Sequence, residues 1–159
     1  MPLIDEGARA PMFALKDQNN EKHALKDALA RGPVVVYFYP KDDTSGCTKQ
    51  ACGFRDALPG FEKLGVTVLG ISPQDEASKA KFAAKHDLNF PILADHDAKV
   101  CEKYGVWQER SMYGNKFMGV VRTTYIVAPS GKVARRFDKV KVPGHAEAVM
   151  ASLEEAGLV

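Results

Sequence analysis

The sequence has few cysteines and no long apolar run. Its 159 residues include 3 cysteines and 1 tryptophan, and aromatic residues make up 9%. So few cysteines, in an odd number, exclude the disulfide scaffold typical of small secreted proteins. No stretch approaches the roughly 20 apolar residues that a helix needs to cross a bilayer. We therefore expect neither a disulfide-rich module nor a membrane span.

An excess of charge of one sign is also missing. Lys and Arg number 22 and Asp and Glu 20, which leaves a formal net charge of +2. This balance does not predict binding to nucleic acid or to an anionic membrane. The N-terminal segment carries Asp5 and Glu6 and lacks the apolar core of a secretory signal. We expect a cytoplasmic protein that binds neither nucleic acid nor membranes.

Metal-ligand spacing is absent as well. The 4 histidines and 3 cysteines form no C-x-x-C and no H-x-x-x-H pair, which argues against structural zinc. With 45% hydrophobic and 26% charged residues, the composition is that of a globular protein, and the length fits one domain. We expect a single domain over 1–159, with no metal and no cofactor.

Short β-rich runs alternate with helical patterns along the chain. Val34 to Tyr39 is β-branched or aromatic throughout, as expected of a strand buried on both faces. The segments 13–15 and 22–25 flank a polar turn and predict an N-terminal hairpin. Further strands are expected at 66–71, 91–93, 123–127 and 133–137, and helices at 47–57, 75–86, 98–104 and 145–156. This order predicts an α/β fold with a central mixed sheet and helices on both faces. A thioredoxin-like topology fits the order, although the order alone does not select it.

Two of these helices have a predicted inner face. In the helix 75–86 the residues available for it are Ala77, Ala80, Phe82 and Ala83, and in the last helix they are Ala148, Val149 and Leu153. We expect these side chains to pack against the sheet.

The most informative residue is Cys47, which follows the first long strand by a short loop. In open α/β sheets, sites form at the carboxyl ends of strands. A helix is predicted to begin here, and its unpaired amide groups and positive dipole end stabilise a thiolate. This setting favours a nucleophilic cysteine over a buried inert one. Cys101 lies inside a helical pattern, and for it we favour the inert reading.

The segment around Cys47 resembles the active-site signature of the peroxiredoxins. Pro40-x-x-x-Thr44-x-x-Cys47 matches that signature, and Cys52 resembles the second cysteine of the Q-type (bacterioferritin-comigratory) subfamily. The likeness extends over 37–56, 68–74, 100–107 and 120–127. Ser45 departs from the pattern, because many members carry proline there.

The resemblance implies a thioredoxin-like fold and a thiol peroxidase that reduces hydrogen peroxide and organic hydroperoxides. It implies that Cys47 attacks the peroxide and that Thr44 hydrogen-bonds the peroxide and the sulfur. Pro40 would shield the site, and Arg122 matches the active-site arginine. Cys52 would resolve the sulfenic acid to an intramolecular disulfide, which a thioredoxin-type dithiol reduces. The resemblance also favours a monomer.

The spacing of Cys47 and Cys52 has a mechanical consequence. On a regular helix, residues five apart have Cα atoms about 8.7 Å from each other, whereas a disulfide needs roughly 4.4–6.8 Å. If both cysteines lie in the helix, it must unwind locally for them to bond. Cys101 stays open as an alternative resolving cysteine.

Other interpretations of the same residues stay open. Cys47 with His145 would suit a cysteine hydrolase, since sequence distance does not forbid spatial closeness. Oxidation of Cys47 could also serve as a signal in a redox sensor or binding module without sustained turnover. The segment 108–119 could form a loop over the site, although we favour Trp107 and Phe117 as satellite core residues.

Overall fold

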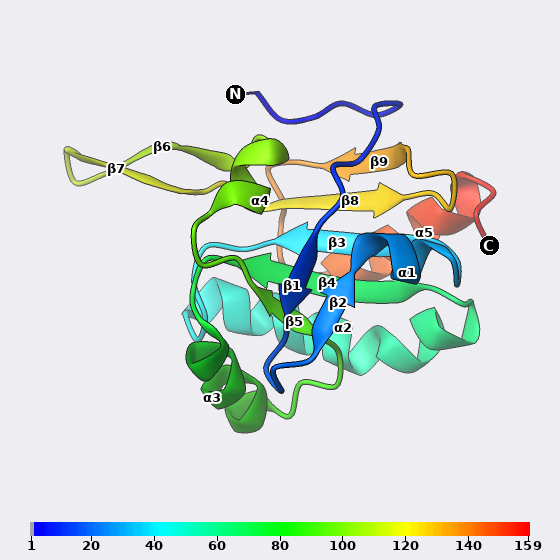
Figure 1. Cartoon of the computed structure of the whole chain (residues 1–159), viewed down its shortest axis with the longest axis horizontal. Coiled ribbons are helices and arrows are strands. Elements are labelled where there is room, and N and C mark those ends of the chain that lie inside the picture. The colour runs from blue at the N-terminus through cyan, green and yellow to red at the C-terminus, as the bar shows by residue number, and fades with distance from the viewer. Residues whose placement is uncertain (1) are drawn as a thin grey trace.

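The computed structural model describes residues 2–159, and its centre is a five-stranded mixed sheet (Figure 1). The strand order is β5-β4-β3-β8-β9. Strands β3, β4 and β5 run parallel, whereas β8 is antiparallel to β3 and β9 to β8. The predicted mixed sheet is confirmed. Its strands are β3 (Val34–Phe38), β4 (Thr67–Ser72), β5 (Ile92–Ala94), β8 (Thr123–Val127) and β9 (Val133–Phe137).

Two antiparallel hairpins complete the strands. The predicted N-terminal hairpin is present as β1 (Ala14–Lys16) and β2 (Lys22–Ala24). The second hairpin, β6 (Trp107–Met112) and β7 (Asn115–Val120), projects from the body of the molecule (Figure 1). This hairpin replaces the loop that the sequence suggested. Trp107 packs against the core as expected, but Phe117 is 46% exposed, so its assignment to the core was wrong.

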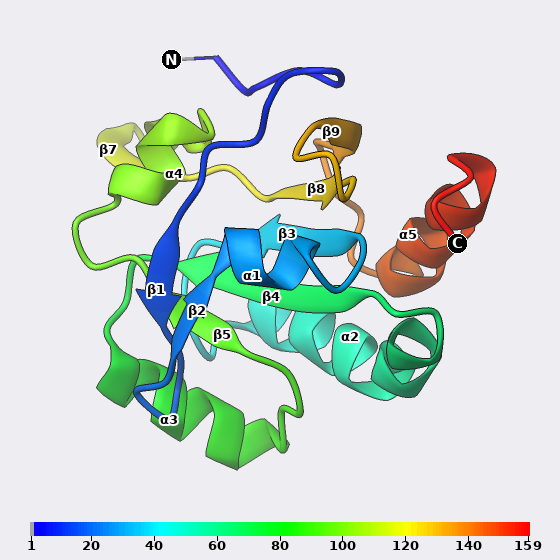
Figure 2. The same ribbon diagram turned by 45° about the vertical axis from the view of Figure 1, so that its right-hand side comes forward.

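Helices lie on both faces of the sheet, as predicted (Figure 2). Buried residues of the two short helices, α1 and α4, belong to the core on one face, and those of α2, α3 and α5 to the core on the other. Within residues 2–159, no helix is both long and apolar enough to cross a membrane. The helices are α1 (Leu25–Leu29), α2 (Ser45–Lys63), α3 (Glu76–His86), α4 (Lys99–Lys103) and α5 (His145–Glu155).

The central strand β3 supplies both cores because its side chains alternate. Val36 and Phe38 face the core of α1 and α4, while Val35 and Tyr37 face the core of α2 and α5. Full burial of a Val or Phe side chain contributes about 1.5–3 kcal/mol. Gly70 on β4 carries no side chain because a Cβ there would lie 2.8 Å from the Tyr37 ring. The strand that leads to Cys47 is therefore fixed from both faces.

Helix α2 is longer than predicted and contains Pro59. A proline inside a helix leaves the carbonyl four residues earlier without its usual donor. That carbonyl belongs to Arg55, and the side chain of Asn89 donates to it at 3.2 Å. A residue from outside the helix thus satisfies the freed group, and the helix continues to Lys63.

Two predicted helix faces need correction. In α3 the buried residues are Lys79, Phe82 and Ala83, whereas Ala77 and Ala80 are exposed. In α5 the buried set includes Ala146, Val149 and Leu153, whereas Ala148 is exposed. A small alanine is as compatible with solvent as with the core, so the pattern was ambiguous at these positions. A buried lysine is rare unless it is paired, and its partner lies elsewhere in the chain.

Candidate active site around Cys47

Cys47 lies in the first turn of α2, close to the carboxyl end of the central strand. Strand β3 ends at Phe38, the loop 40–44 follows, and the helix begins at Ser45. Cys47 is only 1% exposed and has a free thiol. The helix carries no side-chain cap at its start, so the amide groups of the first turn are available to an anion or a polar ligand.

The guanidinium of Arg122 contacts the sulfur directly. Arg122 lies between β7 and β8, and its Nη2 is 3.3 Å from Sγ of Cys47. The approach is possible because Gly46 has no side chain, since a Cβ there would lie 3.2 Å from Nη2. The guanidinium N–H is a charged donor, so this contact is a charge-assisted hydrogen bond to the sulfur. The structure therefore brings together the two residues that the sequence singled out 75 positions apart.

Gln50 was not identified from the sequence, and it holds Arg122 in place. Its Oε1 accepts a hydrogen bond of 2.5 Å from Nη1 of Arg122, and the side chain is buried. Gln50 lies three residues after Cys47, which puts both on one side of the helix. That spacing is the signal that could have pointed to it. Both nitrogens of the guanidinium fork are thus engaged at the site.

Thr44 immediately precedes α2, and its hydroxyl is oriented by the loop. Its Oγ1 donates to the carbonyl of Lys41 at 2.9 Å. With that proton engaged, the remaining lone pairs of Oγ1 can accept a hydrogen bond from a hydroperoxide. The expected hydrogen bond from Thr44 to the sulfur is not among the contacts of residues 2–159. The role of Thr44 toward a peroxide therefore stays a prediction.

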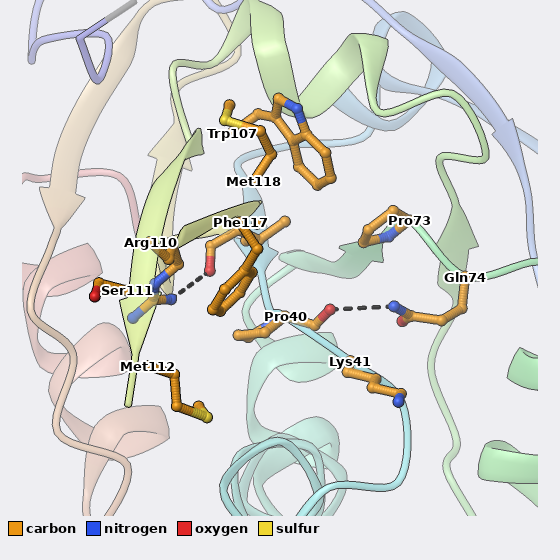
Figure 3. A pocket seen from close by; sticks show the side chains of 12 residues that line it. Pro40, Lys41, Pro73, Gln74, Trp107, Arg110, Ser111, Met112, Phe117 and Met118 are labelled. Carbon is orange, nitrogen blue, oxygen red and sulfur yellow. Dashed lines mark hydrogen bonds between the residues drawn. The ribbon is translucent and has the colours of Figure 1, made fainter. Parts of the chain in front are cut away.

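Pro40 lies at the start of the same loop and borders a groove (Figure 3). The groove has a volume of about 490 Å³. Its other wall is the β6–β7 hairpin, with Trp107, Phe117 and Met118. The groove is thus largely apolar, next to the loop that precedes the cysteine.

Cys52 lies in α2 with Cys47, and both thiols are free. Both cysteines therefore lie in one helix in this reduced form. A regular helix holds their two Cα atoms too far apart for a disulfide, so α2 must unwind locally before they can bond. Cys52 is half-buried, whereas Cys101 is fully buried in α4. Burial strongly raises the pKa of the Cys101 thiol. Cys101 is accordingly an inert core residue in this conformation.

No hydrogen bond joins His145 to Cys47 within residues 2–159. His145 begins α5, is buried, and its Nε2 pairs with the hydroxyl of Thr124 at 2.8 Å. The rings of Phe54 and Phe137 pack against it edge to face. Burial lowers the pKa of His145 to about 4, so it is neutral near pH 7. Its Nε2 pairs with Thr124 and not with Cys47, so the structure gives the hydrolase interpretation no support.

A small cluster of possible metal ligands lies far along the chain from Cys47, at the turn of the N-terminal hairpin. It comprises Asp17, Glu21 and His23. The Asp17 carboxylate already accepts two backbone amides and pairs with His23 at 2.7 Å. These hydrogen bonds stabilise the turn of the hairpin, and they account for the clustering of the three side chains.

Comparisons with known proteins show the family of this chain. Residues 7–136 match the AhpC/TSA family. This chain belongs to that family. Among curated proteins, "Peroxiredoxin Bcp" of Escherichia coli is 43% identical over 155 residues, covering 98% of this chain and 99% of the relative. "Putative peroxiredoxin bcp" of Coxiella burnetii is 43% identical over 150 residues, covering 94% and 99%.

Solved structures place the chain in the same subfamily. PrxQ of Xylella fastidiosa superposes with a TM-score of 0.92 at 32% identity, covering 99% of each chain. Peroxiredoxin Q of Xanthomonas campestris gives a TM-score of 0.84 at 38% identity, covering 90% of each chain. The chain is thus a peroxiredoxin of the Bcp or Q type with a thioredoxin-like fold, and a thiol-dependent peroxidase.

Proposed function

We propose that Cys47 is the peroxidatic cysteine and that Cys52 resolves its oxidised form. One contact carries this assignment, namely the hydrogen bond from Arg122 to the sulfur of Cys47 at the start of a helix. A cysteine beside a guanidinium and at the start of a helix is well placed to react as a nucleophile. A groove bordered by Pro40 and Lys41 lies at the loop that precedes this cysteine, and we propose it as the path of the substrate.

The first step is a displacement at oxygen. The Cys47 thiolate attacks the terminal oxygen of a hydroperoxide, an S–O bond forms, and the O–O bond breaks. The electron pair leaves with the second oxygen, which takes up a proton and departs as water or an alcohol. Arg122 and the first-turn amides stabilise the negative charge that spreads over the two oxygens. Thr44 accepts a hydrogen bond from the peroxide hydroxyl, which fixes its direction of approach.

The second step forms the disulfide. The Cys52 thiolate attacks the sulfenic sulfur of Cys47, an S–S bond forms, and hydroxide leaves as water after protonation. A thioredoxin-type dithiol then reduces the disulfide and is itself oxidised. Cys52 is the favoured partner because Cys101 is fully buried and lies in a different helix.

Organic hydroperoxides fit the groove beside Pro40. Its wall carries Trp107, Phe117 and Met118, which offer an apolar surface to an alkyl or aryl group. A related structure is titled for the alkyl peroxide reduction activity of the Xanthomonas campestris bacterioferritin comigratory protein. We extend that substrate class to this chain, and we place the enzyme in the cytoplasm as a monomer of one domain, 1–159.

Sustained turnover is the expected result when the protein is mixed with hydrogen peroxide and an excess of thioredoxin, thioredoxin reductase and NADPH. NADPH consumption should continue until the peroxide is used up, because each disulfide is reduced again. The Cys47→Ser variant should show none. A single stoichiometric oxidation followed by no further NADPH consumption would instead identify a sensor and contradict the proposed enzyme.

A further inference from the structure

A buried ion pair joins the loop 40–44 to helix α3. Nζ of Lys79 on α3 is 3.0 and 3.1 Å from the two carboxylate oxygens of Asp42. The side chain of Lys79 is 0% exposed and that of Asp42 3%. Removing two charges from water is costly, and a buried ion pair often stabilises a protein less than apolar side chains of similar volume would. Stability alone therefore does not account for its presence at this position.

The pair is hydrogen-bonded on all sides. Asp42 also accepts from the hydroxyls of Tyr39 and Ser78, each at 2.7 Å. Lys79 also donates to Oγ of Ser72 at 2.5 Å. A fully satisfied buried network of this kind permits one geometry and resists displacement. Asp42, and the loop that contains it, are thereby fixed to β4 and α3.

Gln74 extends the network to the backbone of the loop. Its Oε1 accepts from the amide of Asp42 at 3.0 Å and from the hydroxyl of Ser72 at 2.7 Å. Its Nε2 donates to the carbonyl of Pro40 at 3.1 Å (Figure 3). The loop is therefore held at the Pro40 carbonyl, the Asp42 amide and the Asp42 carboxylate. All three points lie within four residues of Thr44.

We propose that Lys79 and Gln74 are positioning residues for the peroxide reaction, acting through the loop 40–44. The inference rests on the proposed role of Cys47. Thr44 Oγ1 bonds to the Lys41 carbonyl, so a shift of the loop moves this ligand acceptor relative to the sulfur of Cys47. Displacement of a reacting group by about 1 Å costs roughly 100-fold in rate.

Anchoring from β4 and α3 also suits the catalytic cycle. The first turns of α2 must unwind when Cys47 and Cys52 bond, so they cannot themselves preserve the geometry of the loop. Strand β4 and helix α3 contain neither cysteine. After reduction, the loop is still in place to receive the refolding helix and its sulfur.

Two reactions of reduced Cys47 separate positioning from general damage. Hydrogen peroxide requires the aligned loop, whereas alkylation by iodoacetamide requires only an accessible thiolate. We expect Gln74→Ala to slow the peroxide reaction about tenfold and Lys79→Met about 100-fold. The pH profile of alkylation should be unchanged in both. Lys81→Met, on the exposed side of α3, is the matched control and should match the wild type in both reactions.

The outcomes are distinct. A Gln74→Ala protein that reacts with peroxide at the wild-type rate overturns the inference, as does a variant in which both reactions change together. If Lys79→Met does not fold, Gln74→Ala decides alone, because it removes only uncharged hydrogen bonds. A wild-type protein that fails to react with peroxide would overturn the proposed function itself. That result is distinct from a failure of the inference, in which the wild type reacts and Gln74→Ala reacts equally fast.

Discussion

Replacing Arg122 by alanine is expected to slow the reaction of reduced Cys47 with hydrogen peroxide by about 100- to 1,000-fold, the usual cost of removing one donor from an anion-stabilising site. The variant loses the hydrogen bond to the sulfur and the fork that Gln50 orients. Thr44→Val should cost less, because it removes a single acceptor, and Thr44→Ser should retain most of the rate.

Thiolate formation alone does not explain an effect of this size. A thiol with a pKa of about 8.5 is roughly 3% ionised at pH 7, and lowering the pKa to about 6 raises that fraction about thirtyfold. Nucleophilicity falls at the same time, by about 13-fold for a Brønsted slope near 0.45. The net gain is only about twofold. Most of the contribution of Arg122 must therefore lie in charge that develops on the peroxide oxygens.

Stopped-flow kinetics and a thiolate titration of the same variants separate the two contributions of Arg122, namely the thiolate fraction and the stabilisation of charge on the peroxide oxygens. Arg31→Ala, an exposed arginine after α1, serves as the control and should behave as the wild type. The Arg122→Lys variant keeps the charge but not the fork, and it should recover only part of the rate. A rate loss that the change in thiolate fraction fully accounts for would refute the prediction.

Oxidation is expected to abolish protection from hydrogen exchange in the first turns of α2. In the reduced protein, Cys47 and Cys52 lie in one continuous helix. Bringing their Cα atoms from about 8.7 Å to disulfide distance requires the segment between them to leave the helix. The amides of residues 48–55 should exchange at least about 100-fold faster after disulfide formation.

Helix α5 provides the internal reference for that experiment, because its amides should exchange equally in both redox states. The Cys52→Ser variant treated with peroxide should keep the protection of the reduced form, since it cannot form the bond. Equal protection of 48–55 in reduced and oxidised wild type would rule out the unwinding. Mapping of a bond between Cys47 and Cys101 by mass spectrometry would assign the resolving role elsewhere.

The sequence predicted the elements with strong local signals. The apolar run at Val34 and the N-terminal hairpin were both correct, because burial on two faces and a polar turn leave clear patterns. Helix α1 was missed because five residues without a side-chain cap carry little signal. The β6–β7 hairpin was missed because most of its residues are exposed, so no buried face imposes an alternation.

The residues of the candidate site also include some that the sequence predicted and some that it did not. Pro40, Thr44, Cys47, Cys52 and Arg122 followed from a family signature, and the contact of Arg122 with Cys47 now supports their grouping. Lys79 could not be predicted, since its partner Asp42 lies 37 positions away and only the fold joins them. The resolving role of Cys52 and the extent of the domain, 1–159, stay predictions.

Intact-mass analysis after one equivalent of hydrogen peroxide tests the central assignment most directly. Wild type should lose about 2 Da as the disulfide forms, and Cys52→Ser should gain about 16 Da as a sulfenic acid. The Cys47→Ser variant should keep its mass, because Cys47 is the only cysteine within residues 2–159 whose sulfur accepts a hydrogen bond from a guanidinium. Oxidation of Cys47→Ser as rapid as that of the wild type would contradict the account.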